Sequence, residues 1–320
     1  MAMRLTPNET RVSRMLPQRR QIPLTRKRIQ NLATPYLFIG PGVVLFMTAI
    51  IYPALQSFRM SFYKWQIVNN AISKYIGFHN YNRAFHDPHF WLSLSNSAIY
   101  MICTVPFEMI IGLSIALLLK KKSPSQPIFR VLFYLPVVTS WVVVSLLFKY
   151  LFADQGLINF TLHDFLHLES GDTSWLSSRT TALVAICALG IWKGIGWAMM
   201  IYLAALQGVP QELEEVATMD GANKWQRFRA VTVPAIAPAT TFISVMLVIG
   251  GLNVFTSVYL ITGGGPIGQT DVILSYMYTQ AFTYLDFGYG SAIASLLALL
   301  VFAIAILQLR VMHKRSYAVD

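Results

Sequence analysis

The chain has 320 residues, of which 55% are hydrophobic and only 12% are charged. Soluble domains carry about 25% charged residues, so this composition excludes an ordinary soluble protein and predicts an integral membrane protein. The net charge of +11 is high enough for a nucleic-acid partner, but the basic residues follow the predicted membrane topology, and we expect no nucleic acid to bind. Cys103 and Cys187 lie inside apolar runs, where we expect neither a disulfide nor a metal.

Residues 1–30 form a basic tail in which eight Lys and Arg residues stand against a single acid, Glu9. Such a tail is able to bind RNA. A basic stretch just before a membrane span more commonly holds that end of the chain in the cytoplasm, against anionic lipid. The apolar run that follows is too long for the core of a secretory signal, and no A-x-A cleavage site ends it.

Six apolar runs predict an all-α membrane protein with six transmembrane helices. The first, Pro35–Ser57, is 23 residues long and uncharged, which is enough to cross a hydrocarbon core of about 30 Å at about 1.5 Å per residue. The other five runs are Asn96–Leu119, Val131–Phe152, Thr180–Gln207, Ala239–Ile261 and Phe287–Leu309.

The Lys and Arg residues are distributed asymmetrically between alternate loops. Segments 1–34, 120–130, 208–238 and 310–320 together hold 18 of these residues, whereas loops 58–95, 153–179 and 262–286 hold five. Because cytoplasmic loops carry the excess of positive charge, both termini and the segment 208–238 are predicted to be cytoplasmic. Six spans give the same result, since an even number returns the chain to its starting side.

One polar segment between two apolar spans, Gln211–Pro238, carries an ordered pattern. Pro210 and three acids in the following residues predict the start of a helix, because a proline presets φ and the acids face the positive end of the helix dipole. Gly221 interrupts the apolar periodicity, and Trp225 and Phe228 provide the apolar face of a second helix. The segment is therefore predicted to be two short helices hinged at Gly221.

This segment resembles the EAA loop of the permeases of ABC importers. The run Glu215-Val216-Ala217, then Gly221 after three residues and Val231-Thr232-Val233-Pro234 after nine more, has the spacing of that motif, with valines in place of the usual alanine, isoleucine and leucine. The resemblance implies that the segment couples the chain to an ATPase subunit; the alternative is a loop folded only for its own stability. The implied coupling residues are Glu215, Ala217, Asp220, Gly221, Ala222, Phe228 and Pro234.

Two outer segments extend the resemblance to the carbohydrate (maltose-type) permeases, in the first-permease subtype. Tyr75–Tyr100 contains a glycine, an Asn-Tyr pair and an Asp-Pro-x-Phe sequence that lead into the second span, as in the carbohydrate permeases. The segments Thr262–Pro266 and Phe287–Gly290 resemble those of the subtype that pairs, as the first permease, with a second one. The resemblance covers most of residues 35–315. It implies a type I importer transmembrane domain at residues 31–315 in the inner membrane, between a basic tail (1–30) and a C-terminal tail (316–320).

The sequence contains no G-x-x-x-x-G-K-[ST] motif, so we expect this chain neither to hydrolyse ATP nor to bind a cofactor. The resemblance implies a second permease subunit in a heterodimer, two cytoplasmic ATPase subunits that hold ATP and Mg, and an extracytoplasmic solute-binding protein. The rival hypothesis is a self-sufficient secondary carrier. Such a carrier should show inverted repeats and several acids within its spans, whereas Glu108 is isolated and we find no repeat.

The fourth and fifth spans hold the candidate transport path. Lys193 lies mid-span, where an ionisable residue commonly marks a path; it either attracts an anionic solute, such as a uronate oligosaccharide or glycerol phosphate, or pairs with a carbonyl or carboxylate of a neighbouring helix. Glycines and Asn253 in the fifth span predict either a polar break or a tight helix crossing. With positions added from the maltose-type resemblance, the predicted path residues are Trp192, Lys193, Gly194, Trp197, Leu247, Gly250, Gly251, Asn253 and Val254.

The histidines lie in loops or in the C-terminal tail and form no catalytic constellation. His163 and His167 have the spacing of two zinc ligands on one helix face, and His86, Asp87 and His89 form a weaker cluster of possible ligands. Solvated loop residues are the commoner explanation of both patterns. We therefore expect a transport protein with no enzymatic activity and no metal site.

Overall fold

The structure is a computed structural model that describes residues 26–65, 73–121, 123–165, 167 and 173–316. Residues 1–25 of the basic tail, residues 317–320 and residues 66–72, 122, 166 and 168–172 lie outside the described residues. The chain divides into two units, Met1–Leu55 and Gln56–Asp320, which are considered separately below.

The first predicted span lies mostly in the first unit. It consists of α1 (Arg26–Phe46), a π-helical turn η1 (Met47–Ile51) and the start of α2 (Tyr52–Met60). Residues Thr34–Met60 are long and apolar enough to cross a membrane, in agreement with the predicted span. The hydroxyl of Thr48 donates to the Val44 carbonyl oxygen at 2.8 Å, which satisfies a polar side chain within its own helix.

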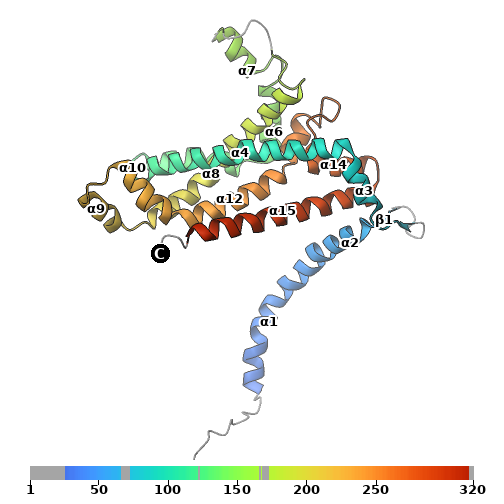
Figure 1. The fold of residues 1–320 in the computed structure, drawn as a ribbon, viewed down its shortest axis with the longest axis horizontal. Coiled ribbons are helices and arrows are strands. Elements are labelled where there is room, and N and C mark those ends of the chain that lie inside the picture. The colour runs from blue at the N-terminus through green and yellow to red at the C-terminus, as the bar shows by residue number, and fades with distance from the viewer. Residues whose placement is uncertain (1–25, 66–72, 122, 166, 168–172, 317–320) are drawn as a thin grey trace, which may run out of the picture. The chain divides into compact units, whose positions relative to one another are not determined.

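The second unit is helical, with one small hairpin, β1 (Tyr63–Lys64) and β2 (Lys74–Tyr75), in which Tyr63 lies opposite Tyr75. The long helices α4, α8, α12 and α15 pass side by side, and α9 and α10 lie at one end of them, on the left in Figure 1. The helices of this unit after α2 are α3 (His79–His86), α4 (Pro88–Lys120), α5 (Gln126–Val138), α6 (Trp141–Leu151), α7 (Leu157–Asn159), η3 (Phe160–Phe165), α8 (Arg179–Gln207), α9 (Gln211–Met219), α10 (Lys224–Arg227), η4 (Phe228–Thr232), α11 (Val233–Ala235), α12 (Ala237–Leu252), α13 (Thr256–Ile261), α14 (Ile273–Tyr278), η5 (Thr279–Thr283) and α15 (Phe287–Ser316).

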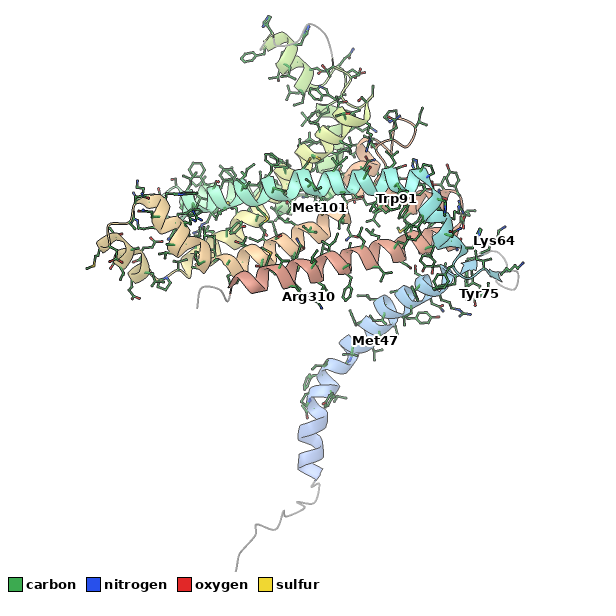
Figure 2. All side chains as sticks on the ribbon, viewed as in Figure 1. Met47, Lys64, Tyr75, Trp91, Met101 and Arg310 are labelled. Atoms are coloured by element: carbon green, nitrogen blue, oxygen red, sulfur yellow. The ribbon has the colours of Figure 1, made fainter. Side chains whose placement is uncertain are left out.

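The centre of this unit is the close crossing of α4 and α8. At Gly112 an added Cβ would lie only 2.9 Å from the Cβ of Ala198, so the two backbones approach as closely as a glycine permits. Met199 and Leu203 are buried on the same face of α8. Figure 2 shows how the side chains fill the space between the helices, with Met101 midway along α4. This crossing fixes the relative positions of the α4 and α8 residues that line the cavity between the helices.

The third predicted span differs from its expectation. The sequence predicts one helix over Val131–Phe152, but the structure has two helices, α5 and α6, that meet at an angle of 93°. The break follows from Pro136, which has no N–H to donate, and from Thr139 and Ser140, whose backbones are extended. The Ser140 hydroxyl then accepts from the Val142 N–H at 3.3 Å and starts α6.

Two other spans refine the predicted boundaries. α4 begins at Pro88 rather than Asn96, because the Asp87 side chain caps the helix by accepting from the His89 N–H at 2.9 Å. The predicted polar break of the fifth span is present, since α12 ends at Leu252 and α13 begins at Thr256. The described residues thus hold five helices long enough to span a membrane, or six if α5 and α6 count as one span.

The end of the second unit opposite α9 is held by polar contacts around the start of α4. The Asp87 carboxylate accepts hydrogen bonds from the hydroxyls of Tyr276 and Tyr289, the latter at 2.6 Å. The His89 ring contacts the Asp271 carboxylate at 3.0 Å. Burial by itself raises the pKa of Asp87, but the tyrosine and backbone hydrogen bonds outweigh it and leave this pKa below its usual value. Asp87 and His89 thus tie the start of α4 to the segments around Asp271, Tyr276 and Tyr289.

Candidate functional site

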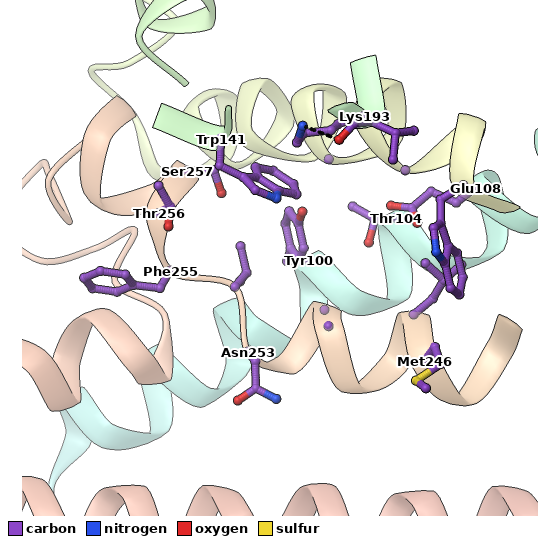
Figure 3. Close-up of a pocket in the computed structure, with 18 residues that line it drawn as sticks. Tyr100, Thr104, Glu108, Trp141, Lys193, Met246, Asn253, Phe255, Thr256 and Ser257 are labelled. Carbon is purple, nitrogen blue, oxygen red and sulfur yellow. Dashed lines mark hydrogen bonds between the residues drawn. The ribbon is translucent and has the colours of Figure 1, made fainter. Parts of the chain in front are cut away.

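A cavity of about 420 Å³ lies between α4, α8 and the two broken spans α5–α6 and α12–α13, a size typical of small-molecule sites (Figure 3). Its wall includes eight of the nine residues that the sequence predicts for the transport path. Trp192 is the exception: it is 41% exposed, and its ring lies 5.7 Å from that of Phe148, outside the cavity. The eight are Lys193, Gly194, Trp197, Leu247, Gly250, Gly251, Asn253 and Val254.

Lys193 is buried, and its ammonium group is held by the broken span. It donates to the carbonyl oxygens of Pro136 and Thr139, both at 2.7 Å, and lies 3.4 Å from that of Val137. It also lies 4.9 Å from the centre of the Trp141 ring (Figure 3). Of the two readings of Lys193 that the sequence left open, these contacts match the pairing with a neighbouring helix's carbonyl groups.

The glycines of the cavity wall have different surroundings. At Gly194 an added Cβ would overlap the carboxyl group of Glu108, so only a glycine leaves room for that side chain. At Gly251 it would lie 3.2 Å from Met101 on α4, so this glycine permits a close helix crossing. Gly250 has open space around it and faces the cavity. Both expectations for the fifth span, the polar break and the close crossing, are therefore met by adjacent residues.

The sequence analysis missed the polar face of α4. Tyr100, Thr104 and Glu108 all line the cavity, and Figure 3 shows them following one another along the same helix. They recur every four residues, which places them on one face of a helix. This spacing could have identified them, but Glu108 was treated as an isolated acid. Trp141 was missed because it faces the cavity only through the break between α5 and α6.

The segment Gln211–Pro238, called the coupling segment below after its predicted role, has the predicted form of two short helices and a glycine hinge. α9 ends at Met219, and Gly221 has φ +78°, a conformation that side chains with a Cβ rarely adopt. The Ala222 N–H then donates to the Ala217 carbonyl oxygen at 3.0 Å and closes the end of α9. Asn223 begins α10 with a reciprocal pair of hydrogen bonds to Gln226, at 2.8 and 2.9 Å.

The two short helices are also tied to each other. Arg227 of α10 donates to the hydroxyl of Thr218 of α9 at 2.7 Å. Within the second helix, the rings of Trp225 and Phe228 stack with their centres 5.4 Å apart. The other predicted coupling residues occupy the outside of this unit: Glu215, Asp220 and Gly221 are exposed, and Ala217, Ala222, Phe228 and Pro234 are half-buried. The segment is thus a rigid element that presents an acidic residue and a positive-φ glycine to its surroundings.

Several large apolar side chains of the coupling segment are left exposed by the described part of the chain. Leu213 and Val216 of α9 are 50% and 55% exposed, and Met219 is 87% exposed. One ion pair, between the Lys120 ammonium and the Glu214 carboxylate at 2.5 Å, joins α9 to the end of α4. Exposed apolar side chains gathered on a rigid polar element are typical of a surface that binds another protein.

No group of three or more His, Cys, Asp or Glu side chains in the described part of the chain is placed to hold a metal ion. His163 lies in η3, and the backbone of His167 turns to φ +50°, so the two do not continue one helix.

A helical membrane protein with a cavity between its spans and a pair of short, exposed helices at one end has the architecture expected of a transporter subunit. The profile of the family described as binding-protein-dependent transport system inner membrane component matches residues 108–316. The chain belongs to this family and is a multi-pass permease component of an ABC transporter in the inner membrane.

Individual relatives agree over nearly the whole chain. The probable ABC transporter permease protein YurN of Bacillus subtilis is 33% identical over 284 residues, which is 88% of this chain and 96% of that protein. The arabinooligosaccharides transport system permease protein AraP of Halalkalibacterium halodurans is 34% identical over 86% of both chains. The lactose transport system permease protein LacF of Rhizobium radiobacter is 31% identical over 88% of this chain and 94% of that protein.

The fold also matches a solved structure. A chain in the crystal structure of a bacterial alginate ABC transporter, in complex with an alginate-bound periplasmic protein, aligns with a TM-score of 0.79. The alignment covers 92% of this chain and 98% of that chain at 22% identity. At this identity the match establishes the fold alone.

Proposed function

We propose that this chain imports a sugar or oligosaccharide, as one of two permease subunits that form the path across the membrane. The cavity supports this proposal most directly, because it combines two indole rings, Trp141 and Trp197, with polar groups in a space the size of a small ligand. Relatives are named for lactose and arabinooligosaccharide transport. A sugar presents both apolar ring faces and hydroxyl groups, and this cavity wall offers partners for both.

The proposed partners follow from the coupling segment. We propose that α9 and α10 dock on one of two cytoplasmic ATPase subunits, which hold ATP and Mg, and that a solute-binding protein delivers the sugar at the opposite end. The exposed apolar face of α9 supports such a contact, and so do Lys120 and Arg310 near the C-terminal ends of α4 and α15, which lie at the same end of the second unit as α9 (Figure 1 and Figure 2). The termini would then both be cytoplasmic.

The contacts of Lys193 bear on the charge of the solute. The sequence suggested an anionic solute only because of Lys193, whose ammonium group is occupied by carbonyl oxygens of the broken span. This contact removes the main reason to expect a uronate or a glycerol phosphate. We therefore propose a sugar as the solute class without assigning it a negative charge.

Reconstitution tests the proposal against its rival, a self-sufficient carrier. The chain is purified with its partner permease and ATPase subunits, placed in liposomes, and supplied with the binding protein and radiolabelled sugar. Uptake should require ATP and the binding protein, and should stop when the P-loop lysine of the ATPase subunits is replaced. Uptake by the chain alone, driven by an ion gradient, would show that it is a carrier.

A further inference from the structure

Two ionisable side chains line the cavity, and they differ in whether they already have partners. Lys193 on α8 and Glu108 on α4 are 4% and 6% exposed. No ion pair in the described part of the chain joins them or includes either one. A solute that enters the cavity therefore meets two different groups, and their remaining hydrogen-bonding capacity decides which one it can bind.

The ammonium group of Lys193 has little capacity left. An ammonium group has three N–H donors, and three carbonyl oxygens of the α5–α6 break lie within 3.4 Å of this one. Those carbonyl groups have no helical partners because the helix breaks there, so the lysine satisfies the break. Binding a solute anion would require the ammonium group to give up these contacts.

The carboxyl group of Glu108, in contrast to the Lys193 ammonium group, keeps its capacity to form hydrogen bonds. No hydrogen-bond donor among the described residues reaches it, although a carboxylate accepts up to about four hydrogen bonds. It points toward Gly194 of α8, where a side chain would overlap it, and it lines the cavity directly. A buried carboxyl group without partners is costly unless a ligand or water supplies donors.

We propose that Glu108 is the group that selects the solute in this cavity, by accepting hydrogen bonds from sugar hydroxyls or by pairing with the ammonium group of an amino sugar. The hydroxyls of Tyr100 and Thr104 extend the same polar face along α4. Trp141 and Trp197 supply apolar surface for the ring. The inference rests on the proposed role of the cavity as the sugar path, and it predicts that a uronate is disfavoured.

A matched set of three probes isolates the effect of charge, because D-glucose, D-glucosamine and D-glucuronate share one ring. Binding of each to the purified permease pair with its ATPase subunits is measured by saturation-transfer NMR, without ATP or binding protein. The wild-type complex should prefer D-glucosamine to D-glucuronate by about tenfold, the factor expected for a charge-assisted hydrogen bond. In Glu108→Gln this preference should fall to about one, because an amide, unlike a carboxyl group, cannot ionise to pair with the ammonium group of D-glucosamine.

Asp154→Asn makes the same chemical change at an exposed residue outside the cavity and should leave the preference intact. The proposal is overturned if wild type fails to distinguish the probes, if it prefers D-glucuronate, or if Glu108→Gln keeps the wild-type preference. Because the measurement needs no ATP, a failure here is distinct from a failure of ATP-driven uptake, which would refute the proposed function instead.

A second measurement covers the case in which Glu108→Gln does not fold. Dicyclohexylcarbodiimide is an apolar reagent that modifies carboxyl groups buried in membranes, and the modified residue is identified by mass spectrometry. D-glucose should slow the modification of Glu108 in the wild-type complex several-fold. This is about the protection expected when the D-glucose concentration is several times its Kd for the cavity. An unchanged rate at saturating D-glucose would overturn the proposal.

Discussion

The cavity and the coupling segment differ in how far apart in the sequence their hydrogen-bonded side chains and partners lie. In the cavity, Lys193 bonds carbonyl groups 54 to 57 residues away, on another span. In the coupling segment, Asn223 and Gln226 bond each other three residues apart, and Arg227 reaches Thr218 nine residues back. The coupling segment therefore holds its own shape, whereas the shape of the cavity depends on the packing of the whole unit.

The largest expected effect comes from Lys193→Met, which tests the long-range part of this comparison. Methionine keeps the length and apolar stem of the side chain but leaves the carbonyl groups at the α5–α6 break without a donor. We expect a loss of about 3 kcal/mol in stability, from unsatisfied buried acceptors. The melting temperature of the purified complex measures it. Lys149→Met, at an exposed position of α6, is the control and should have little effect.

Asp87→Asn tests the polar contacts at the opposite end from α9. The carboxylate accepts from two tyrosine hydroxyls, and we expect a loss of about 2 kcal/mol at pH 7 from weakened charge-assisted hydrogen bonds. Folding lowers the pKa of Asp87, so its stabilising effect is present above the usual carboxyl pKa of about 3.9 and is lost as the pH falls through the folded value.

The pH dependence of the melting temperature provides the control for Asp87→Asn. The difference in melting temperature between wild type and Asp87→Asn should be constant from pH 7 to about pH 5 and should shrink below about pH 4. A difference that stays constant down to pH 3 would show that the ionised carboxylate is not what stabilises this end of the unit.

Gly221→Val tests the local part of the comparison. A β-branched residue at φ +78° costs about 1–2 kcal/mol, and we expect the hinge between α9 and α10 to distort while the cavity is unaffected. The assay measures retention of the ATPase subunits together with solute-stimulated ATP hydrolysis, which should both fall. Gly208→Ala, a glycine with φ −81° at the same end of the unit, is the control. Normal stimulation in Gly221→Val would mean that the hinge has no role in coupling.

The smallest expected effect is at the ion pair that joins α9 to the end of α4. Lys120 and Glu214 are about one-third exposed, and pairs of this kind contribute about 0.2–1 kcal/mol. A double-mutant cycle with Lys120→Met and Glu214→Gln should give a coupling energy in this range for melting, reduced by salt. A much larger value would mean that α9 depends on the rest of the unit for its shape.

Much of this fold could be predicted from sequence because its signals are local. Uncharged runs long enough to cross a bilayer identify the spans, and proline, glycine and capping residues identify the two short coupling helices. The break between α5 and α6 was missed, although Pro136 lies inside the predicted span. A proline in a span is often tolerated as a mild kink, and the sharp 93° turn depends on Lys193 from a distant helix to satisfy the exposed carbonyl groups.

The candidate site was predictable in location but not in chemistry. The resemblance to maltose-type permeases placed six of the eight predicted residues that the structure gathers around one cavity, and the other two, Lys193 and Asn253, were predicted as polar residues within apolar spans. It did not indicate which charged group is free, because that depends on the partners that the fold supplies. Lys193 is the conspicuous mid-span charge in the sequence, yet the structure gives it three carbonyl partners, whereas no donor in the described part of the chain reaches Glu108.

Cross-linking from two positions most directly tests the central claim, that α9 meets the ATPase while the opposite end of the unit faces outward. Met219 at the end of α9 and Ile267 in the loop after α13 are 87% and 95% exposed, and each is replaced by cysteine in the assembled complex. We predict that Met219→Cys cross-links to the ATPase subunit and that Ile267→Cys does not. A cross-link from Ile267→Cys to the ATPase, or none from Met219→Cys, would contradict the proposed orientation and the role of the coupling segment.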